Sequence, residues 1–231
     1  MSFDRLHAPS GAPIERMRAL NPRGGVVLLS EVHGIDAVLR DYAERLVQEG
    51  WSVALPDLWW RHGVPPLGTP ALLREAVASL PDHEALADVA AARTALPAGL
   101  PQFVMGFCIG GLYARMAGCT QVGLSGVVEF YGRIVYPAIT ANKPVQPLDL
   151  LPGLACPIQC HFGTEDAVAP LAHVDELERR LRVRSTPGQL FRYEGCQHAF
   201  MNPERPAWAD EEACAAWGRA LTFLEQAGSA G

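Results

Sequence analysis

Short apolar runs alternate along the chain with stretches whose apolar positions recur every three or four residues. The segments 26–30 and 51–55 are short and almost wholly apolar, which predicts buried strands. Between them, the apolar positions of 36–49 lie on one face of a predicted helix, and Gly50 is placed to end it. This order of strand, helix and strand predicts a βαβ unit.

The same alternation continues to the end of the chain. Further strands are predicted at 102–106, 126–131, 157–162 and 189–193, and further helices at 71–80, 82–96, 112–117, 171–181 and 208–226. Residues 1–25 are expected to form an edge hairpin, and 132–153 form a proline-rich loop. No repeat or linker divides residues 1–231. We therefore expect one α/β domain whose mostly parallel sheet has helices on both faces, with ligands bound at the carboxyl ends of the strands.

Composition narrows the class of protein. The chain is 49% apolar and 19% charged, which is typical of a domain with a sizeable core. Its formal net charge of −6 argues against a nucleic-acid-binding protein. No apolar run reaches the ~18 residues of a membrane span, and residues 1–10 lack the apolar core of a signal peptide. We therefore expect a cytoplasmic protein that binds neither nucleic acid nor membrane. The sequence gives no indication of its oligomeric state.

The six cysteines are read as reduced thiols, in keeping with a cytoplasmic protein. Cys156, Cys160 and His161 have a spacing that invites comparison with a metal site. However, a second pair of ligands at zinc-finger spacing is absent from the sequence. Small buried residues on a strand are the favoured interpretation, and no metal is expected.

One glycine-rich segment carries a candidate nucleophile. Gly106-Phe107-Cys108-Ile109-Gly110-Gly111 lies between a predicted strand and a predicted helix. This is the layout of a nucleophile elbow with cysteine in place of serine. Glycines allow the strained turn, and the N-terminus of the following helix favours the thiolate of Cys108. The alternative is a glycine-rich turn around a buried cysteine.

Partners for Cys108 follow in the order that this elbow requires. Asp166 comes after the strand 157–162, where it can orient an imidazole. His198 comes after 189–193, where it can accept the thiol proton. Glu165 is an alternative to Asp166 because it is adjacent.

The segment after the first buried strand is expected to complete the site. Backbone N–H groups of Val32 and Ile109 are the candidate oxyanion hole. Glu31 stands beside them, and its carboxylate would repel a developing oxyanion. It is therefore expected to be protonated, to turn away, or to act on the thiol. A solvated glutamate at the start of a loop is the alternative.

Together these segments resemble the dienelactone hydrolase family of the α/β-hydrolase fold, over roughly residues 26–224. The motifs that carry the resemblance are Glu31-Val32-His33-Gly34, Pro56-Asp57-Leu58, the Cys108 elbow, Phe130-Tyr131-Gly132, Asp166-Ala167-Val168-Ala169-Pro170 and Gly195-Cys196-Gln197-His198-Ala199-Phe200.

The resemblance implies a role for each of these residues. Cys108 would be the nucleophile, His198 the base and Asp166, rather than Glu165, the group that orients it. Glu31 would contact the resting thiol and help to activate it. Val32 and Ile109 would donate to the oxyanion, and Tyr131 or Phe130 would line the pocket. The implied reaction is hydrolysis of a small-molecule ester or lactone through an acyl-enzyme, with no metal or organic cofactor.

One departure from the family pattern concerns the substrate. Family members that act on dienelactone hold its carboxylate with arginines, one of them four positions after the catalytic histidine. Here that position is Asn202, which cannot form a charged bidentate contact. A second arginine would be Arg61 or Arg74. Trp59 is either a wall of the pocket or part of the core. The departure argues against dienelactone itself and leaves the hydrolase class unchanged.

Two other functions remain open from the sequence. The first is a non-catalytic binding protein on the same fold, and the second is a thioesterase or carbon–halogen hydrolase with the same triad.

Overall fold

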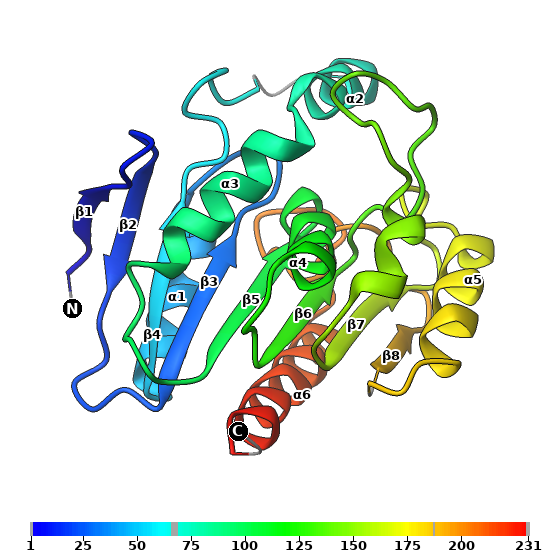
Figure 1. Ribbon diagram of the computed structural model, residues 1–231. Helices are drawn as coiled ribbons and strands as arrows, with labels where there is room; N and C mark the ends of the chain where they lie inside the picture. Colours follow the sequence, from blue (N-terminus) through cyan, green and yellow to red (C-terminus); the bar gives the residue numbers. More distant parts are fainter. Residues whose placement is uncertain (1, 66–68, 187, 230–231) are drawn as a thin grey trace.

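The computed structural model describes residues 2–65, 69–186 and 188–229, and shows one twisted sheet with helices on both faces (Figure 1). The predicted α/β class and mostly parallel sheet are confirmed. The strands are β1 (Asp4–His7), β2 (Pro13–Met17), β3 (Gly24–Leu29), β4 (Trp51–Pro56), β5 (Gln102–Phe107), β6 (Gly126–Phe130), β7 (Ile158–Gly163) and β8 (Gly188–Tyr193). The helices are α1 (Ala37–Gln48), α2 (Pro70–Ser79), α3 (Asp82–Arg93), α4 (Ile109–Thr120), α5 (Leu171–Arg182), α6 (Asp210–Gly228) and the 3-10 helix η1 (Pro147–Gly153).

The sheet has the strand order β1-β2-β4-β3-β5-β6-β7-β8. Strands β3 to β8 run parallel, whereas β1 and β2 form an antiparallel hairpin that pairs with β4 at one edge. Every residue of β3, β4, β6 and β7 is buried. Burial on both faces explains why these strands are mostly apolar runs without alternation.

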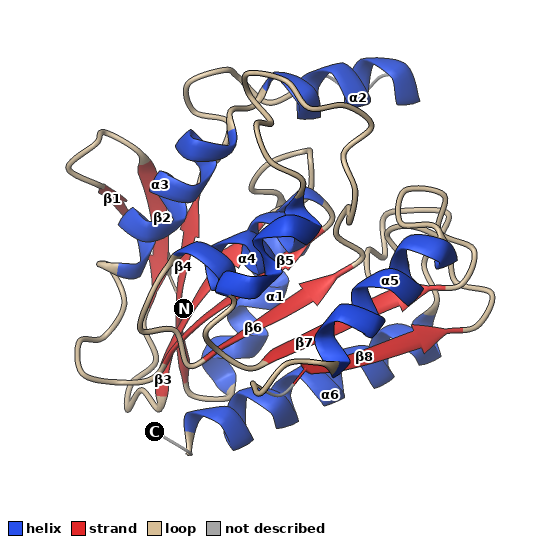
Figure 2. Ribbon diagram, turned by 45° about the vertical axis from the view of Figure 1, so that its right-hand side comes forward, coloured by secondary structure: helices blue, strands red, loops and turns tan. Residues whose placement is uncertain are grey.

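The helices divide the core into two layers (Figure 2). Apolar residues of α3, α4 and α5 pack on one face of the sheet. Those of α1 and α6 pack on the other face. Helix α2 lies beyond the carboxyl ends of the strands, at the top of both views. Within the described residues, no helix is long and apolar enough to cross a membrane.

The bounds of several elements differ from those predicted, as where α3 ends at Arg93 and not at position 96, and two of the differences bear on the fold. Helix α4 begins at Ile109, directly after the elbow cysteine, and not at position 112. Glycines 110 and 111 have low helix propensity, but their place against the sheet overrides it. The 3-10 helix η1 lies within the region expected to be a loop, where Pro147 opens it and Pro152 lies inside it.

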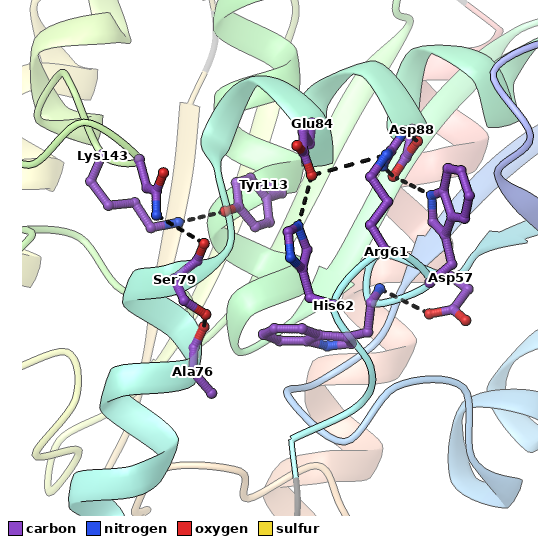
Figure 3. Close-up of polar contacts among 12 residues, drawn as sticks. Asp57, Arg61, His62, Ala76, Ser79, Glu84, Asp88, Tyr113 and Lys143 are labelled. Atoms are coloured by element: carbon purple, nitrogen blue, oxygen red, sulfur yellow. Dashed lines mark hydrogen bonds and ion pairs between the residues drawn. The ribbon is translucent and has the colours of Figure 1, made fainter.

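Helix α3 holds the loops on either side of it by ion pairs (Figure 3). The carboxylate of Asp88 accepts two hydrogen bonds from Arg61, at 2.7 and 3.1 Å. Glu84 contacts His62 at 2.8 Å. At the start of the helix, the buried Asp82 contacts Lys143 Nζ at 2.8 Å. These contacts fix the loops 57–65 and 132–146 to one helix.

A second ion pair is fully buried beneath the segment that follows β6. Arg115 of α4 donates to Glu129 of β6, and both side chains are inaccessible to solvent. Arg115 also donates to the carbonyl of Arg133 at 2.7 Å. Burial raises the pKa of Glu129 to about 7, against the lowering effect of Arg115. The pair ties α4 to the turn that carries Tyr131.

Helix α4 approaches the end of β3 at backbone distance. The N–H of Gly110 donates to the carbonyl of Ser30 at 3.1 Å. A Cβ atom at position 110 would stand 2.5 Å from the carbonyl oxygen of Leu29 and 2.6 Å from that of Ser30. Backbone cannot yield as a flexible side chain can, so this contact requires glycine.

We therefore expect Gly110→Ala to lower the free energy of unfolding by about 1–3 kcal/mol, as overpacking does. Gly218→Ala is the matched control, because Gly218 is also helical but a Cβ there meets open space. That control should raise stability by roughly 0.5–1 kcal/mol through helix propensity. Urea denaturation of both variants measures the difference. Equal effects of the two substitutions would contradict the assigned packing.

Candidate active site

Cys108 occupies a sharp turn between β5 and α4. Its φ is 54° and its ψ is −115°, a backbone conformation that is strained for a residue with a side chain. Its N–H donates to the carbonyl of Phe130 at 3.0 Å, which anchors the turn to the neighbouring strand. The thiol therefore stands at the carboxyl edge of the sheet, directly before the N-terminus of a helix.

The structure brings Cys108, His198 and Asp166 into one hydrogen-bonded line. His198 Nε2 lies 3.0 Å from Cys108 Sγ, and His198 Nδ1 lies 2.8 Å from Asp166 Oδ2. Asp166 is buried, whereas the adjacent Glu165 is exposed. The histidine side chain is 22% exposed, so a bound ligand can reach it. This is the geometry of a nucleophile, a base and an orienting carboxylate.

Backbone donors hold the second oxygen of the carboxylate. The N–H groups of Val168 and Ala169 donate to Asp166 Oδ1 at 2.7 and 3.1 Å. These bonds stabilise the ionised carboxylate and leave Oδ2 for the imidazole. The sequence reading did not predict them. The short Asp-x-Val-Ala segment before the proline offered the signal, because aspartate side chains accept from N–H groups two or three residues later.

The charges of Cys108 and Asp166 favour the protonated form of the His198 imidazole. Burial alone would lower the pKa of His198. The neighbouring Cys108 and then Asp166 outweigh it, and together they raise the pKa of His198 to about 10. These interactions favour the protonated ring beside the sulfur. Such a cation stabilises a thiolate, which is the reactive form of cysteine.

The two candidate oxyanion donors lie on neighbouring segments. Ile109 is the first residue of α4, and Val32 follows the end of β3. The bond between Gly110 and Ser30 holds these segments together. Across the described part of the chain, neither the Val32 nor the Ile109 N–H donates to a protein acceptor. Both amides are thus left to donate to another group.

Glu31 is held by two uncharged donors. Tyr131 O–H donates to its Oε1 at 3.1 Å, and Asn202 Nδ2 donates to its Oε2 at 2.9 Å. In the described residues, Glu31 makes no hydrogen bond to Cys108. The thiol contact that the family resemblance implies is thus replaced here by a contact between the thiol and His198. Burial first, and then the Glu31 carboxylate, hold the pKa of Tyr131 well above its ordinary value, so its phenol remains a donor.

A small cavity adjoins this carboxylate. It is lined by side chains of Glu31, Asp36, Val38, Tyr42, Tyr131 and Asn202, among others. Phe107, the residue before Cys108, also lines it. Tyr131 further packs the edge of its ring against His198, with centroids 5.1 Å apart. This cavity wall, which includes Glu31, Tyr131 and Asn202, thus lies beside the hydrogen-bonded residues Cys108, His198 and Asp166.

The other residues singled out in the sequence lie elsewhere. Phe130 is fully buried and stacks between Phe107 and His161. Trp59 is 1% exposed and belongs to the core. Arg61 is paired with Asp88, and Figure 3 shows its guanidinium directed at α3. Arg74 lies exposed on α2, and among the described residues its side chain makes no hydrogen bond or ion pair.

Sequence reasoning also missed the surroundings of His33. Burial lowers the pKa of His33, and the charge of nearby Arg205 lowers it further. Position 205 follows Asn202 by three residues, and its N–H donates to the Asn202 carbonyl at 3.0 Å. Asp36, which caps α1 by accepting from Leu39 N–H at 2.8 Å, was also not predicted to face a cavity. Its position before a helical pattern was the available signal.

The described residues contain no group of three or more histidine, cysteine or acidic side chains placed to hold a metal. The six cysteines are all free thiols. Cys156 and Cys160 are buried, and the sulfur of Cys160 lies 3.7 Å from Glu129 Oε2.

Comparison with known proteins assigns the chain to a family. The model of the dienelactone hydrolase family matches residues 14–228. A Bradyrhizobium protein named "Probable 2-oxo-3-(5-oxofuran-2-ylidene)propanoate lactonase" is 31% identical over 204 residues, which cover 86% of this chain and 82% of the relative. An Escherichia coli K12 protein named "Putative carboxymethylenebutenolidase" is 30% identical over 209 residues, or 88% and 77% of the two chains.

A solved structure shows the same likeness in three dimensions. The crystal structure titled "Putative Dienelactone Hydrolase" from Klebsiella pneumoniae superposes with a TM-score of 0.88. It is 27% identical in sequence and covers 97% of this chain and 98% of its own.

The contact between imidazole and sulfur predicts how fast Cys108 reacts with iodoacetamide. In His198→Asn the neighbouring imidazole is lost, and with it the cation that stabilises the thiolate. We expect its alkylation at pH 6.5 to slow by about tenfold or more, and the difference to shrink above pH 9.

Peptide mass spectrometry over pH 5.5–9.5 measures that rate. Exposed Cys214 serves as an internal reference, whose profile should be identical in both proteins. Equal alkylation of Cys108 in the two proteins at pH 6.5 would show that His198 does not activate the thiol.

Proposed function

Because the chain belongs to the dienelactone hydrolase family and is a carboxymethylenebutenolidase-like hydrolase, we propose that it cleaves carboxylic esters or lactones through a Cys108–His198–Asp166 triad. One observation carries the proposal. The sulfur, the imidazole and the carboxylate lie in line at 3.0 and 2.8 Å, on a strained turn at the carboxyl edge of the sheet.

The first half of the reaction transfers the acyl group to sulfur. The Cys108 thiolate attacks the carbonyl carbon, and the negative charge moves to the carbonyl oxygen. The N–H groups of Val32 and Ile109 donate to that oxygen. As the tetrahedral intermediate collapses, the bond to the alcohol oxygen breaks, and His198 returns the proton to it. The product is a thioester with Cys108, and with a lactone the alcohol stays attached to the acyl group.

The second half hydrolyses this thioester. His198, now neutral, accepts a proton from water as the water attacks the acyl carbon. The same two N–H groups stabilise the second tetrahedral intermediate. Its collapse releases the carboxylic acid and regenerates the thiolate–imidazolium pair. Asp166 stays ionised throughout and stabilises the imidazolium.

The substrate class rests on the relatives. The Bradyrhizobium protein is named a lactonase, and the Escherichia coli protein a carboxymethylenebutenolidase. The proposed substrate of this chain is accordingly a small ester or lactone. Glu31 does not serve as the proton acceptor of the thiol in this scheme, since His198 holds that position.

Replacing the nucleophile tests the proposal. Cys108→Ala should lower kcat/KM for p-nitrophenyl acetate and for cis-dienelactone by at least about a thousandfold, because no covalent route remains. Release of p-nitrophenol and loss of lactone absorbance measure the two reactions.

Cys214→Ala is the matched control, since it removes an exposed thiol far along the chain from the elbow. It should keep full activity. If Cys108→Ala kept it too, the cysteine mechanism would be wrong.

A further inference from the structure

Among the residues that the structure describes, every side-chain donor that reaches Glu31 is uncharged. Tyr131 contributes a phenol at 3.1 Å and Asn202 an amide at 2.9 Å. Two neutral hydrogen bonds satisfy the carboxylate oxygens but do not cancel their charge. Glu31 is only partly buried, and Tyr131, which donates to it, also packs its ring against that of His198.

A second carboxylate lines the same cavity. The Asp36 side chain accepts the N–H of Leu39 at the start of α1, and it borders the cavity together with Glu31. The remaining walls named above are apolar or uncharged, including Val38, Tyr42 and Phe107. This wall therefore carries two carboxylates and, among its lining residues, no arginine or lysine.

Two of the arginines that could offset this charge, Arg61 and Arg74, are engaged or lie elsewhere. Arg61 makes a bidentate pair with the buried carboxylate of Asp88 and stacks on Trp60, with its guanidinium 4.2 Å from the ring centroid (Figure 3). Arg74 lies exposed on α2. Arg205 is a further cation in this region: its charge acts on His33, on which the charges of Glu31 and Asp36 also act.

From these contacts we infer that the site selects against substrates that bear a carboxylate and takes uncharged esters or lactones. The inference rests on the proposed function and names the substrate class for it. A carboxylate on the bound acyl group would meet Glu31 and Asp36, whose side chains have only neutral hydrogen-bond donors among the described residues. Like charges a few ångströms apart near a protein surface cost enough to change a rate by about tenfold. Selectivity of this kind comes from repulsion of the wrong ligand.

The relatives make the contrast specific. The compound in the name of the Bradyrhizobium relative is a propanoate, and the name of the Escherichia coli relative contains a carboxymethylene group. Both names describe lactones with a carboxyl group. This chain would share their chemistry and differ from them in the charge of its substrate.

The test compares two esters that differ only in charge. They are p-nitrophenyl hydrogen adipate, with a terminal carboxylate, and p-nitrophenyl methyl adipate, in which that carboxyl is capped. We expect the wild-type protein to favour the capped ester by about tenfold in kcat/KM, and added salt to reduce the preference. The ratio is taken within one protein, so a variant that is partly inactive still reports it.

Three variants assign the preference to particular residues. Glu31→Gln removes the charge and should bring the ratio close to one. Asn202→Arg adds a cation beside Glu31 and should shift the ratio toward the carboxylate. Asn202→Gln, the matched control, keeps an uncharged amide and should keep the wild-type ratio.

The outcomes separate failure of the inference from failure of the proposed function. Equal use of both esters by the wild-type protein, or a ratio unchanged in Glu31→Gln, would overturn the inference alone. A wild-type preference for the carboxylate that Arg205→Gln abolishes would also overturn it and would assign the anion contact to Arg205. If neither ester is cleaved in a Cys108-dependent manner, the proposed function itself is wrong.

Discussion

The close contact between the start of α4 and the end of β3 sets the geometry on which the site depends. Only a glycine at position 110 lets the N–H of this helix reach the carbonyl of Ser30. That bond fixes the helix N-terminus, the turn of Cys108 and the loop of Val32 relative to one another. The proposed nucleophile is attached to one of these backbone segments, and the two proposed oxyanion donors are backbone N–H groups of the same segments. A backbone hydrogen bond joins the segments, so side-chain motion does not change their relative positions.

The carboxylates of this protein have two roles: some hold loops in place, and others line the pocket. The three carboxylates of helix α3 contact Arg61, His62 and Lys143. These contacts hold the loops in place. The carboxylates at the pocket, in contrast, are bonded by neutral groups. The same residue types therefore have opposite roles in two parts of the fold. The roles are decided by whether each carboxylate has a cation as its partner.

Most of the fold was predictable from apolar patterning, because β3, β4, β6 and β7 are buried on both faces and read as continuous runs. The order of Cys108, Asp166 and His198 was also readable, since each follows a strand. The partners of Glu31 were not, because Tyr131 and Asn202 are 100 and 171 residues away in the chain. Nor was the pairing of Arg61 with Asp88, which depends on how a loop folds against a helix. Spacing within a segment predicts local structure, and contacts between distant segments require the packed fold.

The ion pair of Arg115 and Glu129 restricts how the sequence can change over time. It lies wholly out of water, beneath the turn that carries Tyr131. Losing one partner strands a charge in the core at a cost of about 3–5 kcal/mol, against a total stability of ~5–15 kcal/mol for a typical domain. Replacing both partners by apolar residues of similar volume avoids that cost. We therefore expect the two positions to change together, because a chain that keeps only one partner loses a large part of its stability.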